Sequence, residues 1–469
     1  MRPTENNDQP PMPPTGRRIL IVSDDEELSG SVADHAESWG NHVERLHRPD
    51  DDALHARLPH SIDGVAVVSR DDIVALRYAL LVEHLAPQIR LAVTIFDRTV
   101  ADELARAAPN CTVLAMTDAI VPALLGSCIA PDLVSLQRVD GHTLAVRSTP
   151  DGPLVERLPR PTRPWRHRLG TVLGQFRPVD NSSRALLTGL LGMLFVFGLD
   201  SALAWAMFGE HWFDAIWHSA RTLTTIGSSP AADHAPAWYK VLSTASMLAV
   251  LAFAAMFTAG FVERLMSSRL TGIIGARAVP RRHHVVVVGL GQAALRLCRE
   301  LQGQGIDVVA VERGNHAPCL PLARELGVPV VLGRGGDRFL LQRLSLPKAR
   351  ALAAVSSDGL QNISVAVTAR AVAPHLPIVL RAGGDDVTAE SQSLFRIGTV
   401  CDISRIAGPF IAARLLGLEP LTVFPMQDRI FALFAPDLVL DLADWVTVPV
   451  SDRNDRAAPA PPFVNRSRT

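Results

Sequence analysis

The chain has 469 residues, of which 48% are hydrophobic and 20% are charged, and its formal net charge is −1. This length allows two or three domains. The near-zero charge excludes a globally basic protein that binds nucleic acid, and a mean hydropathy of +0.19 is high for a protein without membrane segments.

Both ends of the chain are polar and rich in proline, which is typical of segments that bury too little apolar surface to fold. We therefore expect residues 1–16 and 451–469 to be disordered tails, and we recognise no secretory signal at the start. The five cysteines have no paired or metal-ligand spacing, so we expect reduced, cytosol-facing core residues and no metal site. They are Cys111, Cys128, Cys298, Cys319 and Cys401.

Residues 17–150 repeat a later part of the chain. A shift of 287 residues aligns residues 67–94 with residues 354–381 without gaps, and six positions are identical. Further upstream the shift is 265, so the first copy lacks about 22 residues, the size of one strand–helix unit. We expect the missing unit to be the counterpart of residues 328–344.

Residues 151–184 form a basic, proline-rich linker. We interpret it as a solvated positive flank of a membrane segment rather than as a specific lipid site.

Two apolar segments follow: residues 185–208, with one charge in 24 residues, and residues 241–262, with none in 22. Each is long enough to cross a hydrocarbon core of about 30 Å. The alternative is a pair of buried core helices. Arginine-rich flanks outside both segments favour two membrane spans, a pore domain at residues 185–262, and both chain ends in the cytoplasm. Asp200, inside the first span, is either a functional residue or one that faces a neighbouring helix.

The hairpin between the spans, residues 212–230, starts with apolar residues at helical spacing and ends in TLTTIGSSP. A half-helix followed by Thr-Thr-Ile-Gly resembles the layout of a two-span potassium channel subunit. In such a pore, four chains each contribute a loop whose carbonyl groups replace the hydration shell of the ion. We expect the ion pathway to be lined by Thr224, Thr225, Ile226, Gly227 and Ser228.

The end of this loop departs from the potassium-channel pattern Thr-Val-Gly-Tyr-Gly-Asp. Ser228, Ser229 and Pro230 occupy the last three places. Glycine at the second glycine position adopts positive φ freely, whereas Ser229 does so only with strain. Cation conduction is therefore better supported than strict potassium selectivity.

After a linker at residues 263–282, residues 283–417 show the strand–helix alternation of a parallel α/β domain. A buried-strand run leads into Gly289-x-Gly291-x-x-Ala294 and an amphipathic helix, and the next strand ends at Glu312. This is the fingerprint of a dinucleotide-binding fold, with a pyrophosphate at the helix N-terminus and the acid on a ribose. Glu312 favours NAD or an adenine nucleotide over NADP, and the adjacent Arg313 weakens that preference. The alternative is the same fold with an empty crevice.

The first copy has lost these residues. The shift of 265 places Asp24 at the position of Gly289, Glu26 at that of Gly291, Ser29 at that of Ala294 and His47 at that of Glu312. Carboxylates repel a pyrophosphate. We expect the N-terminal domain to bind no nucleotide and to assemble with the second copy.

Residues 284–417 resemble the N-terminal half of RCK domains (regulators of potassium conductance, also called TrkA-N domains). The resemblance rests on VVVVGLGQAA, on Glu312, on AVSSDGLQN and on the arginine of IVLRA. It implies that Gln292, Asp358, Asn362 and Arg381 lie near the nucleotide crevice. Asp358 also fits a helix N-cap, because it follows a strand.

The predicted fold is an α-helical membrane domain of two transmembrane helices plus a re-entrant pore helix. Two α/β Rossmann-like RCK domains with parallel sheets flank it, and residues 418–450 form a C-terminal extension. The predicted function is a ligand-gated cation channel subunit with K⁺ as the permeant ion. NAD or an adenine nucleotide would gate it, in a homotetramer in the plasma membrane.

Two alternatives remain. One is a nonconducting membrane-bound nucleotide sensor that has kept the channel scaffold. The other is a membrane-tethered NAD-dependent oxidoreductase, for which no segment large enough for a catalytic domain is left, so no catalytic residue is predicted. His283 and His284 are interpreted as structural rather than as a metal or catalytic pair.

Overall fold

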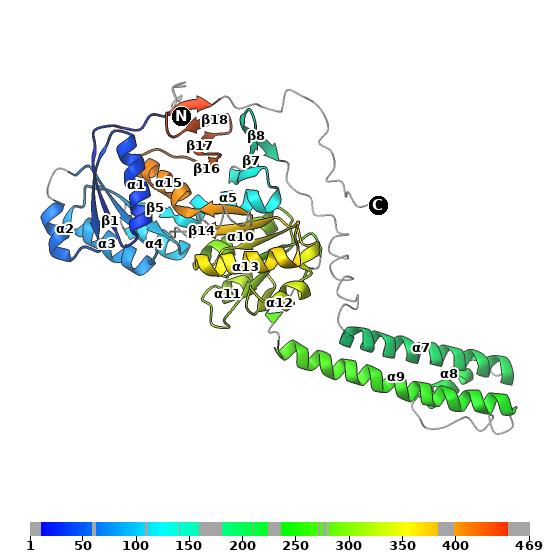
Figure 1. The fold of residues 1–469 in the computed structure, drawn as a ribbon. Coiled ribbons are helices and arrows are strands. Elements are labelled where there is room, and N and C mark those ends of the chain that lie inside the picture. Colours follow the sequence, from blue (N-terminus) through cyan, green and yellow to red (C-terminus); the bar gives the residue numbers. More distant parts are fainter. Residues whose placement is uncertain are drawn as a thin grey trace, which may run out of the picture. The chain divides into compact units, whose positions relative to one another are not determined.

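The computed structural model divides the chain into two compact units, one of Met1–Arg163 with Ile274–Thr469 and one of Pro164–Ile273 (Figure 1). It describes residues 11–58, 62–107, 111–139, 141–158, 181–209, 211–223, 236–270, 273–274, 279–280, 282–382 and 398–448.

The N-terminal copy contains a five-stranded parallel sheet in the order β2-β1-β3-β4-β5. Its central strands are buried along almost their whole length, as expected of a parallel sheet covered by helices on both faces. The strands are β1 (Arg18–Ser23), β2 (His42–His47), β3 (Gly64–Val68), β4 (Arg90–Ile95) and β5 (Cys111–Ala115). The helices are α1 (Glu26–Ser38), α2 (Asp51–Arg57), α3 (Asp72–Leu85), α4 (Arg98–Ala107) and α5 (Met116–Ile129).

The second copy contains a seven-stranded sheet in the order β15-β14-β13-β10-β11-β12-β9. The strands are β9 (Ile273–Ile274), β10 (Val285–Val288), β11 (Val308–Glu312), β12 (Val330–Leu332), β13 (Ala351–Ala354), β14 (Ile378–Ala382) and β15 (Thr399–Asp402). The helices are α10 (Gln292–Gly303), α11 (Leu320–Glu325), α12 (Arg338–Arg343), the 3-10 turn η2 (Leu346–Lys348), α13 (Gly359–Val372) and α15 (Ile403–Leu415).

The two sheets have the relation that the repeat predicts. In both, the strand after the first crossover helix lies on one side of the first strand, and the remaining strands follow on the other side. The second sheet adds β12, next to β11, with α12 after it, and among the described residues nothing in the first copy corresponds to them. The missing strand–helix unit is therefore confirmed as the counterpart of β12 and α12.

The repeat continues beyond the parallel sheets, which the sequence did not predict. A three-stranded antiparallel sheet of β6 (Leu133–Val139), β7 (His142–Thr149) and β8 (Gly152–Leu158) follows the first copy. A four-stranded antiparallel sheet of β16 (Thr422–Met426), β17 (Arg429–Ala435), β18 (Leu438–Asp441) and β19 (Val446–Val448) follows the second. The expected linker at 151–184 thus starts with a strand, because residues 152–158 pair with β7. The expected extension at 418–450 is a sheet.

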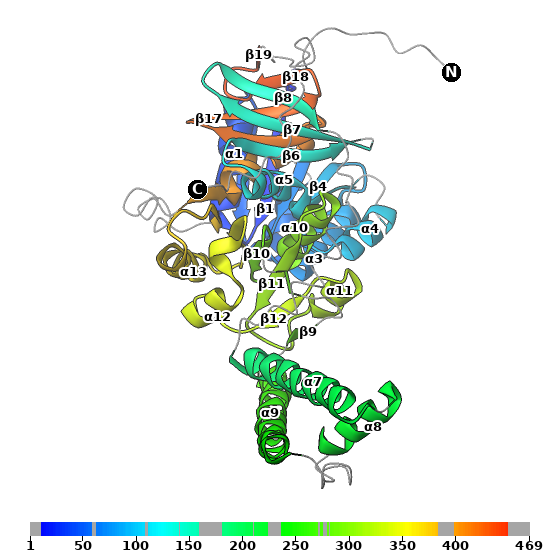
Figure 2. The same ribbon diagram turned by 90° about the vertical axis from the view of Figure 1, so that its right-hand side faces the viewer.

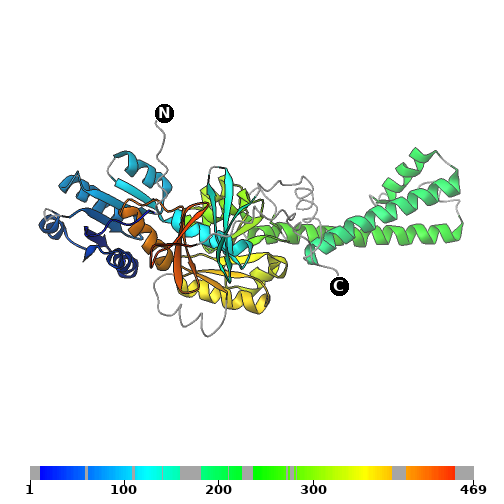
Figure 3. The same ribbon diagram turned by 90° about the horizontal axis from the view of Figure 1, so that it is seen from above.

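The two copies pack against each other as a pseudo-symmetric pair. Helix α15 of the second copy lies on α1 of the first, and α5 of the first copy lies on α10 of the second (Figure 3). The two antiparallel sheets also lie together (Figure 2) and share one apolar core. Ser135 and Thr422, which are equivalent under the shift of 287 residues, form a buried hydrogen bond of 2.9 Å. Contact between equivalent residues is the signature of a two-fold axis.

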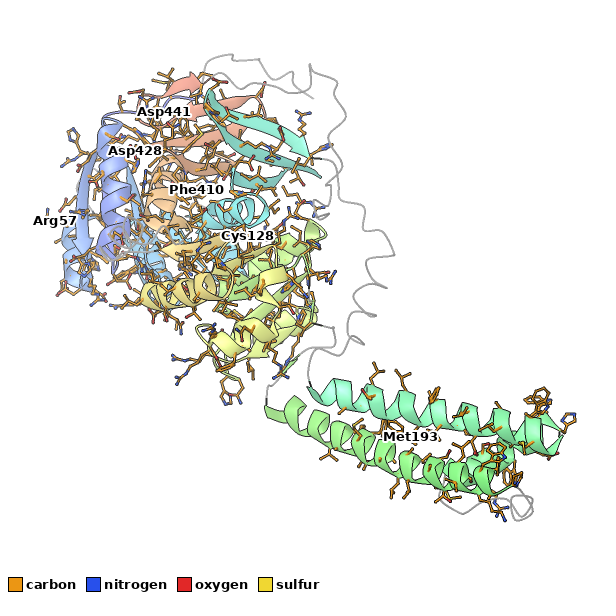
Figure 4. The ribbon with its side chains drawn as sticks, turned by 45° about the vertical axis from the view of Figure 1, so that its right-hand side comes forward. Arg57, Cys128, Met193, Phe410, Asp428 and Asp441 are labelled. Carbon is orange, nitrogen blue, oxygen red and sulfur yellow. The ribbon has the colours of Figure 1, made fainter. Side chains whose placement is uncertain are left out.

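One continuous core joins the two copies. Cys128 on α5 and Phe410 on α15 both belong to it (Figure 4), together with Val32 on α1 and Cys298 on α10. All five cysteines are buried and unpaired, as predicted. Burial raises the pKa of the Cys298 thiol to about 12, so these thiols stay protonated.

The other unit contains three helices: α7 (Asn181–Phe208), α8 (Trp212–Leu223) and α9 (Ala237–Leu270). Helices α7 and α9 are long and apolar enough to cross a membrane, over Ala185–Met207 and Ala237–Val262. Only 17% and 11% of their most apolar windows are buried within the chain, whereas a core helix of a soluble protein would be mostly buried. Helix α9 extends to Leu270, so the linker expected from residue 263 is helical in its first part.

Small residues let α7 and α9 approach each other. A Cβ atom on Gly189 would lie 2.7 Å from the carbonyl oxygen of Phe253 and from the amide nitrogen of Phe257. Close backbone approach at small residues is how helices pack in lipid. Asp200 is 8% exposed on α7, whereas many neighbouring apolar side chains are exposed. The alternative in which Asp200 faces a neighbouring helix fits this burial.

Candidate functional site

A tight turn joins β10 to α10 at the carboxyl end of the second sheet. Gly289 has φ of +89°, and a Cβ atom there would lie 2.9 Å from the backbone of Ser356. Both the left-handed conformation and the close approach require glycine at this position. At Gly291, by contrast, φ is −92° and a Cβ atom would meet nothing within 4 Å. The space in front of Gly291 is open.

Helix α10 starts at this open space without a side-chain cap. Gly291 is its N-cap residue and supplies no side-chain hydrogen bond. The first N–H groups of a helix have no partner within the helix, and the helix dipole adds positive potential there. An anion is the natural partner of such an end. Ala294 is fully buried, one turn along, where its small side chain lets the helix lie on the sheet.

Glu312 closes the next edge of the crevice. Its Oε2 accepts a hydrogen bond of 2.7 Å from the Leu290 amide, and its Oε1 accepts one of 2.8 Å from the Arg313 amide. The carboxylate at the end of β11 is thereby fixed against the glycine turn. The Arg313 side chain is exposed.

Asn362 is a framework residue of the crevice. It is 1% exposed, and its Oδ1 accepts a hydrogen bond of 3.1 Å from the Ser356 amide. Its Nδ2 donates to the carbonyl oxygens of Ser356 and Arg381, both at 2.9 Å. These bonds tie the ends of β13 and β14 together. Asp358 caps α13 by accepting a 3.0 Å hydrogen bond from the Gln361 amide, in agreement with the helix-cap interpretation.

Arg381 is partly buried at the end of β14, on the side of the first copy. Burial, with a contribution from Arg70, lowers its pKa to about 10, so the guanidinium remains charged at neutral pH. The sequence placed Arg381 near the crevice by resemblance, and its strand end is hydrogen-bonded to Asn362.

The first copy fills the equivalent space with its own charges. Asp25 caps α1 by accepting a 3.1 Å hydrogen bond from the Leu28 amide. Arg70 forms an ion pair with Asp25 and lies 3.8 Å from Glu27. The helix end that would receive a pyrophosphate is thus occupied by a carboxylate and neutralised by a guanidinium. This arrangement agrees with the prediction that the N-terminal domain holds no nucleotide.

The structure adds one residue that the motif did not reveal. Asp97, directly after β4 of the first copy, accepts a hydrogen bond of 3.2 Å from Nε2 of Gln292, the first residue of α10. The two residues are 195 positions apart. No local spacing signals such a contact.

The proposed ion pathway, Thr224, Thr225, Ile226, Gly227 and Ser228, lies outside the described residues. The structure describes α8, which ends at Leu223 directly before it. Among the described residues there is no group of three or more side chains suited to a metal ion.

Comparison with known proteins identifies one domain. The sequence pattern of the TrkA-N domain matches residues 285–396. Among curated proteins, none matches the chain.

The chain is similar to several solved structures. The GsuK channel bound to NAD shares 13% identity with a TM-score of 0.46, over 88% of this chain and 66% of that one. GsuK bound to ADP shares 20% identity with a TM-score of 0.27, over 46% of this chain and 58% of that one. The TrkA-N domain of the inner membrane protein ybaL from Escherichia coli shares 26% identity with a TM-score of 0.26, over 29% of this chain and 97% of that one.

The glycine turn, the uncapped start of α10 and the fixed acid at the end of β11 all fall inside the matched segment. Residues 285–396 of this chain are therefore a TrkA-N domain.

Proposed function

We propose that the chain is the subunit of a ligand-gated cation channel, with K⁺ as the permeant ion and NAD or an adenine nucleotide as the regulatory ligand. The observation that carries the proposal is the open, uncapped end of α10 beside Glu312, in a chain that also has two helices long enough to cross a membrane. A binding site without catalytic residues, combined with membrane helices, suits a sensor that acts on a pore.

The nucleotide part of the proposal rests on chemistry. The amides at the start of α10 would receive the pyrophosphate, and Glu312 would accept hydrogen bonds from ribose hydroxyls. Gly291 would let the phosphates approach the backbone. Asn362 and Asp358 would act indirectly, because their hydrogen bonds hold Ser356 and the start of α13.

The pore part rests on the order of elements. Helix α8 lies between the two candidate spans and leads directly into Thr224, the start of the proposed ion pathway. A conducting pore needs several copies around one axis, because one loop cannot surround an ion. We therefore propose a homotetramer in the plasma membrane with both chain ends in the cytoplasm.

Exposed apolar side chains support self-assembly. On α3, Ile73 and Leu80 are 79% and 49% exposed, and on α13, Leu360 and Val367 are 60% and 46% exposed. The shift of 287 residues makes these two pairs equivalent. Each pair has a spacing of seven residues and therefore lies on one helix face. Copies of the chain that cover these faces would bury them.

The alternative is a nonconducting nucleotide sensor, favoured by Ser229 and Pro230 at the end of the proposed filter. Planar-bilayer recordings of the purified protein, first in K⁺ and then in Na⁺, with and without NAD⁺, separate the two functions. We expect a cation current whose open probability changes with NAD⁺. NAD⁺ binding without current would establish the sensor instead.

Gly291→Ala tests the nucleotide site directly. Its Cβ atom meets no protein atom, so the thermal stability should be unchanged. The methyl group enters the space proposed for the phosphates, so the affinity for NAD⁺ measured by calorimetry should fall by about tenfold or more, since one steric intrusion of a methyl costs 1–3 kcal/mol, roughly. Gly303→Ala, also in open space at the end of the same helix, is the control and should bind NAD⁺ normally. Equal affinity in both variants would contradict this site.

A further inference from the structure

The start of α10 faces a carboxylate from the other copy. Asp97 accepts a hydrogen bond of 3.2 Å from Nε2 of Gln292, beside the amides that the proposed site offers to phosphates. Cys319, in the same region, marks the position of Asp97. Burial, with contributions from the Asp97 and Glu312 carboxylates, raises the pKa of its thiol. Asp97 and Glu312 therefore both lie near Cys319.

The turn that carries Asp97 is held in place. Asp72, the first residue of α3, accepts hydrogen bonds from the amides of Phe96 and Asp97, at 2.8 and 2.7 Å. Because the backbone of Asp97 is fixed from its own domain, its carboxylate is a pre-organised part of the crevice rather than a side chain that happens to reach it.

We propose that Asp97 is a specificity-determining residue of the nucleotide site, which disfavours ligands with additional phosphate charge. The inference rests on the proposed nucleotide site. The pyrophosphate diester of NAD⁺ carries two negative charges and its nicotinamide carries one positive charge, whereas ADP adds the charge of a terminal phosphate. A carboxylate beside the phosphates repels each extra charge, and this repulsion is strong where protein reduces the dielectric constant. Asp97 therefore shifts the preference of the site towards the dinucleotide.

The position of Asp97 also links the ligand to the pairing of the two copies. A ligand that displaces Gln292 from Asp97 weakens a contact between the copies, and by reciprocity the contact weakens the ligand. Selectivity and regulation would then depend on the same carboxylate.

The test is calorimetric binding of NAD⁺ and of ADP to the full-length protein in detergent, for the wild type and for Asp97→Asn. Asparagine keeps the shape and can still accept the hydrogen bond from Gln292, so the fold should be retained. We expect the affinity for ADP to rise on the order of tenfold and that for NAD⁺ by no more than about threefold, with a smaller difference at 1 M salt. Asp97→Glu should keep the wild-type preference.

Asp102→Asn is the matched control, since Asp102 is an exposed carboxylate on the following helix, and it should change neither affinity. If Asp97→Asn leaves the ratio of the ADP and NAD⁺ affinities unchanged while the wild type binds NAD⁺, Asp97 does not determine specificity and the proposed site stands. If the wild type binds neither nucleotide, the proposed site itself fails, and this inference fails with it. Thermal unfolding of each variant shows whether a lost affinity reflects a lost fold.

Discussion

At the scale of single residues, the two copies differ in what stands at the start of one helix. In the second copy Gly291 leaves the N-terminus of α10 uncapped, and in the first copy Asp25 caps α1 with its own carboxylate. Arg70 then neutralises that carboxylate. A helix end satisfied within the protein has little free energy to offer an anion, since the ligand would have to displace the existing cap.

His284 gives a prediction at this scale. It is fully buried at the start of the second copy, and Leu344 O lies 3.1 Å from its Nε2. Burial lowers its pKa to about 4 from an ordinary value of 6.5. The unfolded chain therefore binds a proton between pH 6.5 and 4 that the folded chain does not bind, so the free energy of unfolding falls as the pH falls through this range. The loss should reach on the order of 3 kcal/mol by pH 4.

Denaturant unfolding at several pH values between 4 and 7 measures this dependence. His284→Gln should flatten it, whereas His283→Asn should not, because His283 is exposed and has positive φ, which asparagine tolerates. An unchanged pH dependence in His284→Gln would assign the acid sensitivity to other groups.

At the scale of elements, helices do the work that strands cannot. The parallel sheets carry the crevice, and α5 and α15 cross to the opposite copy and cover its helices α10 and α1. The antiparallel sheets then close the pair around Ser135 and Thr422. In the other unit, α7 and α9 depend on the small side chains at their contact.

The contact of α7 with α9 gives the second prediction. In Gly189→Ala the new methyl group meets backbone atoms of Phe253 and Phe257 at 2.7 Å, which no rotamer change relieves. The helices must separate, at a cost of about 1–3 kcal/mol. We expect a lower unfolding temperature of the detergent-solubilised protein.

Gly198→Ala, on the same helix, is the control. Its Cβ atom meets nothing within 4 Å, so this variant should be neutral or slightly more stable. Equal unfolding temperatures for the two variants would show that α7 and α9 do not pack closely at Gly189.

At the scale of the whole molecule, the chain is a pseudo-symmetric pair of domains interrupted by a helical unit. The pairing uses one side of each copy, through α1, α5, α10 and α15. The exposed apolar pairs on α3 and α13 remain outside it. A repeated unit with two sticky faces can join further copies of itself, and closure of such contacts produces a ring.

The third prediction concerns these faces. Leu360→Asp, or Ile73→Asp on the equivalent face, places a charge where we propose that another copy packs. The mass of the protein in detergent, measured by light scattering, should fall below that of the wild type. Leu322→Asp is the control, because Leu322 is 42% exposed on α11, away from both helices, and its charge should leave the mass unchanged. A wild-type mass for Leu360→Asp and Ile73→Asp would exclude α3 and α13 as assembly surfaces.

Much of this fold could be predicted because its signals are local. Runs such as Val285–Val288 are buried on both faces and therefore apolar throughout, and the glycine turn of Gly289 follows from a backbone that only glycine adopts without strain. The repeat also showed itself, because an ungapped shift keeps Ser69 with Ser356 and Asp71 with Asp358. The roles of Asn362 and Asp358 were less clear, since a polar residue after a strand serves a ligand or a helix cap equally well.

The sequence by itself determined the two apolar spans, the TrkA-N domain, the loss of the first nucleotide site and the missing strand–helix unit. Only the tertiary structure decided how the copies pair, that the antiparallel sheets share a core, and that Asp97 reaches Gln292. The physical reason is range. Periodicity and turn chemistry act over a few residues, whereas Asp97 and Gln292 lie 195 positions apart, and Ser135 and Thr422 lie 287 apart. Such contacts form only when two finished surfaces meet.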